Sequence, residues 1–132
     1  IDNLSARLKR GIPLAFKHDK PKREGNLNDC IQALLADGKQ QIEREYPGIR
    51  YAISTAVPDH SLPEYHLLLE AKYIRGKRIP SKMTEEIAAD ITKFKRAGHT
   101  LFIVYDPETR IVDRDKFREI QEGENCTVLI VP

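Results

Sequence analysis

The stretch YHLLLEAKYI, residues 65–74, decides the fold class of this chain. Its three consecutive leucines indicate a strand that is buried on both faces, as strands of parallel sheets are. Side chains alternate between the two faces of a strand, so Glu70 and Lys72 point to the same side. An acid and a base are costly to bury in an apolar strand unless they pair or bind something. The stretch therefore predicts either a polar site on a central strand or a buried Glu70–Lys72 ion pair.

The segments around this strand predict an α/β domain. Residues 50–57 have the composition of a strand, with room for one strand or two very short ones, and a turn-rich piece, 58–63, follows. Ser81 is well placed to cap a helix over 81–97, and the apolar run 101–105 predicts a buried strand. The helix between the two strands is long enough for a parallel crossover, so we expect a mixed central sheet flanked by helices.

The remaining elements set the expected domain organisation. Further helices are expected at 2–10, from residue 28 or 29 to Pro47-Gly48, and at 115–121, with a last strand at 128–131. The stretch 11–25 contains two prolines and many charges, which favours an arm or linker on the surface. We therefore expect an N-terminal helix with a basic arm or linker, 1–26, and one domain, 27–132.

The composition is that of an ordinary globular protein. The chain has 132 residues, of which 40% are hydrophobic and 32% charged. No apolar run approaches the roughly 20 residues of a membrane span, and the start has no signal-peptide pattern, so no membrane partner is expected. Cys30 and Cys126 lack metal-ligand spacing, which favours free thiols and a reducing, cytoplasmic setting. Because the chain starts at Ile1 and ends at Pro132 directly after an apolar run, we expect a module of a longer protein that contacts its other domains.

The basic residues gather in two clusters, although the net charge is only +2. One cluster lies between residues 7 and 23. The other follows the candidate strand with no acid between Lys72 and Lys82, and it contains Arg75, Lys77, Arg78 and Lys82. A solvated loop would explain one such cluster, whereas two clusters, one of them beside a candidate site, indicate a polyanionic ligand. We expect the four residues of the second cluster to contact phosphates.

A second acid, Asp59, stands eleven residues before Glu70, after the preceding predicted strand. If the two strands pair through the intervening turn, the Asp59 carboxylate comes near Glu70. Two converging carboxylates suit a hard divalent cation such as Mg²⁺. Beside that cation, Lys72 could help deprotonate a water or stabilise a phosphorane-like transition state. The alternative is a structural ion pair of Glu70 and Lys72, with Asp59 capping a turn.

These residues resemble the PD-(D/E)xK nuclease superfamily. Pro58-Asp59, then Glu70-x-Lys72, then a helix and a buried strand carry the resemblance, which covers roughly 27–105. The segment LLLEAKYIRGK…EEIAADITKF…LFIVYDP is similar to the subgroup related to GATC-cutting type II restriction enzymes. The resemblance implies an α/β restriction endonuclease-like core in which Asp59 and Glu70 bind Mg²⁺, with Mn²⁺ as an alternative, and Lys72 assists the attacking water.

The resemblance leaves the remaining acids open. Many members of the superfamily add an acid from the helix before the sheet, and Glu45 is the best placed here, with Glu43 as the alternative; either also fits a solvated helix residue. The usual core has a three-stranded meander before the crossover helix, for which residues 50–59 leave little room. Glu64 is therefore the alternative for the second carboxylate.

The function implied by the resemblance is hydrolysis of DNA phosphodiester bonds by a metal-dependent endonuclease. Such a domain would serve as the cleavage module of a prokaryotic defence or restriction protein. The expected partner is double-stranded DNA, and a homodimer is left open. A non-catalytic nucleic-acid-binding or docking module with the same fold is the alternative.

Overall fold

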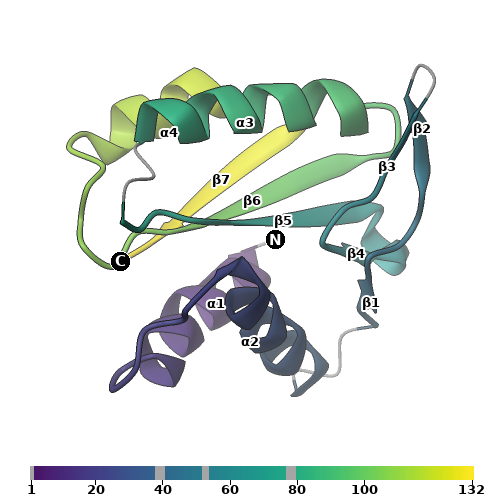
Figure 1. Cartoon of the computed structure of the whole chain (residues 1–132). Helices are drawn as coiled ribbons and strands as arrows, with labels where there is room; N and C mark the ends of the chain where they lie inside the picture. Colours follow the sequence, from purple (N-terminus) through teal and green to yellow (C-terminus); the bar gives the residue numbers. More distant parts are fainter. Residues whose placement is uncertain (1, 38–40, 52–53, 77–79) are drawn as a thin grey trace.

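The computed structural model describes residues 2–37, 41–51, 54–76 and 80–132 (Figure 1). Its centre is a five-stranded sheet of order β1-β4-β5-β6-β7. The strands are β1 (Glu43–Arg44), β4 (His60–Leu62), β5 (Leu67–Tyr73), β6 (His99–Tyr105) and β7 (Cys126–Val131). The strand β4 is antiparallel to both β1 and β5, whereas β5, β6 and β7 are parallel to one another. The sheet is therefore mixed, as predicted.

Two pairs of helices cover the two faces of this sheet. The helices α1 (Asp2–Ala15) and α2 (Glu24–Asp37) lie on one face, and α3 (Pro80–Phe94) and α4 (Arg114–Gln121) lie on the other (Figure 1). The helix α3 connects β5 to β6, as the crossover argument required. The outcome is the expected α/β architecture. In the described part of the chain, no helix is both long and apolar enough to span a membrane.

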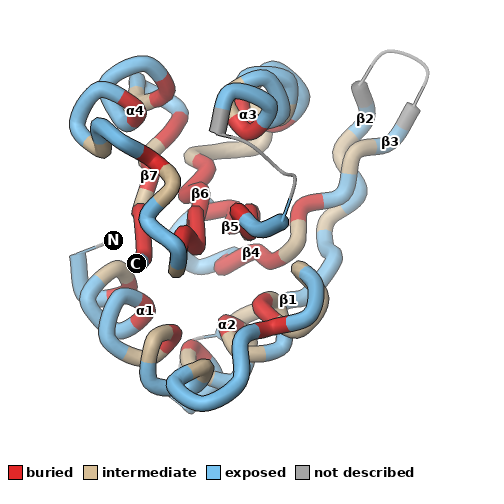
Figure 2. Tube along the Cα trace, turned by 60° about the vertical axis from the view of Figure 1, so that its left-hand side comes forward, coloured by how far each residue is buried: buried red, intermediate tan, exposed pale blue. Residues whose placement is uncertain are grey.

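Strand alternation divides the apolar interior into two cores. Leu69 and Tyr73 of β5 pack with the buried residues of α1 and α2. Phe102 and Val104 of β6 pack with those of α3 and α4. Figure 2 shows the buried central strands between these helices. The even-numbered residues of β5 face α3, so this face receives Glu70.

The N-terminal part differs from the expectation of a surface arm starting at Gly11. The helix α1 continues through Pro13 to Ala15, and Ile12 is fully buried in the core that α1 shares with α2. A Cβ at Gly11 would lie only 2.6 Å from a methyl carbon of Leu34, so the absence of a side chain lets the two helices approach closely. Exposed residues do connect the helices over 17–23, apart from Pro21. The division of the chain at residue 26 stays a prediction.

The segment between α2 and β5 also differs from expectation. The helix α2 begins at Glu24 and ends at Asp37, well before Pro47. The described residues of this segment form the second of the two alternatives, two short antiparallel strands, β2 (Ile49–Tyr51) and β3 (Ser54–Ala56). The piece 58–63, expected to be a turn, contains β4, because three residues suffice to extend the sheet beside β5.

Candidate active site

The candidate site lies beside the first residue of β4, at the point where β5 extends beyond its pairing with β4. His60 pairs with Leu69, so Asp59 stands opposite Glu70, just outside β4. Beyond Glu70, β5 has no β4 residue beside it, and carboxylate side chains accept hydrogen bonds from its backbone N–H groups. Asp59 Oδ2 accepts from the Ala71 N–H at 2.8 Å, and Glu24 Oε1 accepts from the Tyr73 N–H at 3.2 Å. Two carboxylates thus take the place of a neighbouring strand along this part of β5.

Two backbone-to-carboxylate hydrogen bonds hold Asp59 and Glu70 side by side. The Asp59 N–H donates to Glu70 Oε1 at 2.8 Å, while the residue after Glu70 donates to Asp59 as described above. These bonds hold the two carboxylates beside each other at the end of β4, as strand pairing had suggested. The structure therefore brings together the two acids that the sequence singled out.

Burial of two acids at one place makes ionisation of both unfavourable. The Glu70 side chain is buried, and burial together with the nearby charge of Asp59 raises the pKa of Glu70 to about 8. Burial also raises the pKa of Asp59, against the opposing effects of the Ala71 N–H and of the Lys72 charge. Near neutral pH, the pair is therefore expected to hold either a proton or a cation.

Lys72 pairs with an acid from the crossover helix instead of Glu70. Its Nζ lies 2.8 Å from Asp90 Oδ2 of α3, and the two side chains are only 10% and 17% exposed. Burial alone would lower the pKa of Lys72, but the hydrogen bond and the charge of Asp90 outweigh it and raise the pKa. Lys72 is thus a fixed cation, and the Glu70–Lys72 ion pair considered as the structural alternative is replaced by a Lys72–Asp90 pair.

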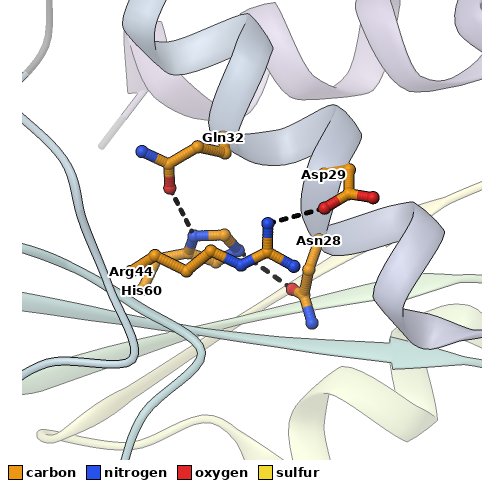
Figure 3. A network of polar contacts seen from close by, with 5 residues as sticks. All are labelled: Asn28, Asp29, Gln32, Arg44 and His60. Carbon is orange, nitrogen blue, oxygen red and sulfur yellow. Dashed lines mark hydrogen bonds and ion pairs between the residues drawn. The ribbon is translucent and has the colours of Figure 1, made fainter.

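One face of α2 supports the site from the other side of the sheet. Glu24, Asn28 and Gln32 follow one another at intervals of four residues, so they form one stripe along α2. The nearby Asn28 side chain acts to lower the pKa of Asp59, against the stronger effect of burial. His60 lies between Asn28 and Gln32 (Figure 3), with its Nε2 2.9 Å from Asn28 Oδ1 and its Nδ1 3.0 Å from Gln32 Oε1.

The comparison with known families identifies the kind of protein in which this site occurs. The model of the DpnII-MboI restriction endonuclease family matches residues 22–132. The chain belongs to this family. It is therefore a PD-(D/E)xK nuclease relative of GATC-cutting type II restriction enzymes, and its fold is restriction endonuclease-like. A DNA nuclease function follows at this general level, with DNA as the substrate. No curated protein and no solved structure gives a significant match.

The donor set of this DpnII-MboI family member fits a hard divalent cation held by two protein carboxylates. Mg²⁺ typically takes one or two carboxylates together with waters and substrate phosphates. Asp59 and Glu70 supply such a pair, and a bound cation would offset the burial and the charge of Asp59 that raise the pKa of Glu70. Among the described residues, no three His, Cys, Asp or Glu side chains gather closely enough to hold a metal ion.

The other acids proposed for the site have exposed side chains. Glu43 lies in β1 and Glu45 directly after it, so neither is on the helix before the sheet, because that helix ends at Asp37. The Glu45 N–H donates to the Asp59 carbonyl at 2.9 Å, which brings the backbone of Glu45, but not an observed side-chain contact, to the site. Glu64 lies in a 3-10 turn and is also exposed. Their roles as ligands stay predictions.

Sequence reasoning missed the acid that the helix does bring to β5. Glu24 lies in the first turn of α2 and accepts the Tyr73 N–H. It was missed because the helix was expected to begin four or five residues later. The periodic polar stripe that Glu24 begins is the signal that would have revealed it.

The basic cluster of this family member is described only in part. Arg75 is exposed and its guanidinium lies 5.2 Å from the centre of the Tyr73 ring. Lys82 is exposed on α3, with a loose ion pair to Glu85 at 3.9 Å. Lys77 and Arg78 lie outside the described residues. Phosphate contacts of this cluster stay a prediction.

Proposed function

We propose that this domain is a metal-dependent endonuclease that hydrolyses phosphodiester bonds of double-stranded DNA. The single observation that carries the proposal is the placement of two carboxylates side by side. Glu70 accepts the Asp59 N–H and Asp59 accepts the Ala71 N–H, with the cationic Lys72 two residues beyond Glu70 on the same strand. Membership of a restriction endonuclease family supports the choice of DNA as the substrate.

Asp59 and Glu70 would hold Mg²⁺, with Mn²⁺ as the alternative ion. When bound, such a cation polarises a phosphate oxygen and makes a water a stronger nucleophile at neutral pH. Ionised Asp59 and Glu70 would then lie beside a compensating charge, which opposes the burial and the charge of Asp59 that raise the pKa of Glu70. The bound cation would therefore favour the ionised forms of Asp59 and Glu70, and these carboxylates would hold the cation.

Lys72 acts in this proposal as a fixed positive charge. Because Asp90 keeps its amine protonated, Lys72 cannot accept a proton from the attacking water. It can donate hydrogen bonds to that water or to a phosphate oxygen, and it stabilises the negative charge that grows on phosphate in the transition state. Of the two roles open from the sequence, the ion pair with Asp90 favours the second.

The wider setting is proposed on the basis of family membership alone. We propose that the domain is the cleavage module of a prokaryotic defence or restriction protein in the cytoplasm. Other domains of a longer chain would select the target, and a second copy of the domain would cut the opposite DNA strand.

Cleavage of supercoiled plasmid and of single-stranded DNA, each with Mg²⁺, with Mn²⁺ and with EDTA, tests the function. We expect nicked and linear plasmid only in the presence of a divalent ion. Lys72→Ala should lower the cleavage rate by about 10²-fold or more, which is the usual effect of removing a positioned catalytic group. DNA binding in Ca²⁺ should persist. The matched control is Asp29→Asn, because Asp29 lies on α2 but is exposed and pairs with Arg44.

A non-catalytic DNA-binding module is the second candidate. It is favoured by one observation, namely that Asp59 and Glu24 satisfy backbone N–H groups of β5 and so have a structural use without any metal. A parent protein that binds duplex DNA but cleaves none with Mg²⁺ or Mn²⁺ would establish this candidate and overturn the nuclease proposal.

A further inference from the structure

The strands β2 and β3, together called the ribbon, stand apart from the central sheet. They pair with each other as a two-stranded sheet that is separate from the five-stranded one. Figures 1 and 2 show the ribbon projecting from the body of the domain. A two-stranded sheet is only marginally stable in water unless something packs against it. The contact of β2 with α3 supports one side of the ribbon, which leaves the other side for a partner.

The two faces of the ribbon differ in exposure. Arg50 lies directly opposite Thr55, so their side chains share one face, and both residues are exposed. Ile49 lies opposite Ala56 on the other face, and both residues are half-buried. None of the ion pairs among the described residues involves Arg50. The exposed face therefore presents a guanidinium group beside a hydroxyl and a methyl group.

Both ends of the ribbon are attached at the candidate active site. Only Val57 and Pro58 separate the end of β3 from Asp59, the proposed metal ligand. Three residue steps of extended chain span at most roughly 11 Å, so Asp59 lies within that distance of the ribbon. Before β2, the Glu45 N–H donates to the Asp59 carbonyl at 2.9 Å, which ties the other end of the ribbon to the same residue.

Duplex DNA suits the exposed face of the ribbon by its shape and by its chemistry. The major groove is about 12 Å wide and admits a two-stranded β-ribbon. Arginine donates paired hydrogen bonds to O6 and N7 of guanine, and threonine contacts base edges or the thymine methyl group. When a phosphate is bound at Asp59, the groove beside it lies within the reach of the ribbon.

We propose that the ribbon enters the major groove beside the scissile phosphate and that Arg50 reads a guanine there. The inference rests on the proposed function, in which DNA is bound at Asp59 and Glu70. It deepens that function, because it assigns base recognition to an element outside the metal site. The ribbon would determine which bases flank the cut, whereas other domains of a longer chain would bring the module to its target.

Selection of bound duplexes from a pool of randomised sequence tests this readout without cleavage when it is carried out in Ca²⁺. The parent, used as the whole 132-residue chain, should enrich a guanine at one position. Arg50→Ala should lose this enrichment, and its affinity for the enriched duplex should fall by about 10- to 100-fold, the effect of losing a bidentate contact to a base. The matched control is Lys116→Ala, which removes another exposed cation and should keep the enrichment.

A change in the DNA tests the same contact from the side of the base. 7-Deazaguanine lacks the N7 acceptor but still pairs with cytosine. At the enriched position it should weaken binding of the parent by about 3- to 10-fold, because one of the two hydrogen bonds is lost. It should weaken binding of Arg50→Ala no further, whereas Lys116→Ala should respond as the parent does.

Other roles of the ribbon give different results. If Arg50→Ala weakened binding to all sequences alike and reduced the salt slope by about 0.9, Arg50 would be a phosphate contact and the readout would be overturned. If Arg50→Ala converted a dimer to a monomer in sedimentation velocity without changing the enriched sequence, the ribbon would bind a second copy of the chain instead. A parent that enriches no guanine would also overturn the readout.

Failure of this inference is distinguishable from failure of the proposed function. A parent that cleaves DNA with Mg²⁺ but has no base preference near the cut would be a nuclease whose ribbon reads nothing. A parent that selects guanine through Arg50 but cleaves no DNA with Mg²⁺ or Mn²⁺ would retain the readout and overturn the nuclease. A parent that binds no duplex DNA would overturn both.

Discussion

At the scale of one residue, ionisation of the buried Glu70 carboxyl group lowers the stability of the folded protein. Burial and the charge of Asp59 raise its pKa from an ordinary 4.5 to about 8 in the folded protein. Between these two values the folded state binds a proton that the unfolded state has released, so the stability of the fold falls as the pH rises. The stabilisation is complete below about pH 4.5 and is lost by about pH 8.

Glu70→Gln should therefore stabilise the metal-free protein at high pH. Glutamine cannot ionise, so the variant should melt at a higher temperature than the parent at pH 8 in EDTA. Its melting temperature should also decline less between pH 5 and pH 8, while cleavage is abolished. Thermal unfolding followed by circular dichroism measures both. The control is Glu85→Gln on the exposed face of α3, and a lower melting temperature for Glu70→Gln at pH 8 would mean that ionised Glu70 is favourably paired.

The Lys72–Asp90 pair leads to a second prediction at this scale. Removal of one partner of a buried pair leaves an uncompensated charge, which costs about 3–5 kcal/mol. Asp90→Asn should therefore lower the free energy of unfolding strongly, because it leaves the buried ammonium without its partner. Adding Lys72→Met to Asp90→Asn should restore much of that stability without restoring cleavage. Urea unfolding of the two single variants and the double variant measures the coupling, and independent, additive effects would contradict it.

At the scale of elements, α1 is part of the core that supports β5. Leu8 and Ile12 are fully buried and pack in the same cluster as the inward side chains of β5 and β6. Ile12→Ala should lower the free energy of unfolding by about 2–5 kcal/mol, the usual range for a buried aliphatic truncation. Urea denaturation measures it, with the exposed Leu14→Ala as control. If deletion of residues 2–15 left the stability unchanged, α1 would not belong to the core.

The connection after β5 carries a prediction about DNA. Arg75 and Lys82 are exposed basic residues next to the strand of Glu70, and each phosphate contact contributes about 0.9 to the slope of log affinity against log salt. Arg75→Glu with Lys82→Glu should weaken binding to all duplex sequences alike and flatten that slope. Fluorescence anisotropy in Ca²⁺ over a salt series measures it, with Lys116→Glu together with Arg118→Glu on α4 as a charge-matched control. An unchanged slope would mean that the cluster is only solvated.

Local pattern predicted the elements that are long and apolar. β5, β6 and β7 were found because each contains a continuous apolar run, and α3 because its apolar residues follow the helix period. β4 was missed because three residues, His60–Leu62, are too short for any period, and its pairing with β5 comes from tertiary contact. The start of α2 was missed because its first turn is polar.

The site residues also divide into those that local sequence pattern predicts and those that only tertiary packing brings together. Glu70 and Lys72 could be predicted because alternation within one strand places them together, and Asp59 because a short turn brings it back to that strand. Asp90 and Asn28 come from helices on opposite faces of the sheet. Their contacts depend on how these helices are packed, which local sequence pattern does not specify.

At the scale of the whole molecule, the site depends on both helical layers. Glu24 of α2 accepts the Tyr73 N–H of β5, whereas Asp90 of α3 holds Lys72. Since a ligand that binds only the folded state stabilises it, a bound cation should raise the stability of the entire domain. The prediction is a rise in melting temperature with Mg²⁺ that is larger at pH 8 than at pH 5, because protons compete for Glu70 at the lower pH. Differential scanning calorimetry measures it, and an equal rise in Glu70→Gln would place the cation elsewhere.

The carboxylates along β5 have one further consequence, which concerns self-association. Beyond β4, the N–H groups of Ala71 and Tyr73 would be a template for a strand of another molecule if nothing accepted them. Asp59 and Glu24 accept them, and they also place negative charge where an incoming strand would have to lie. The acids that make the domain a candidate nuclease thus also guard it against edge-to-edge aggregation. An inactive variant intended for structural work is therefore better made by Lys72→Met together with Asp90→Asn than by removing Asp59, since losing Asp59 would open this edge.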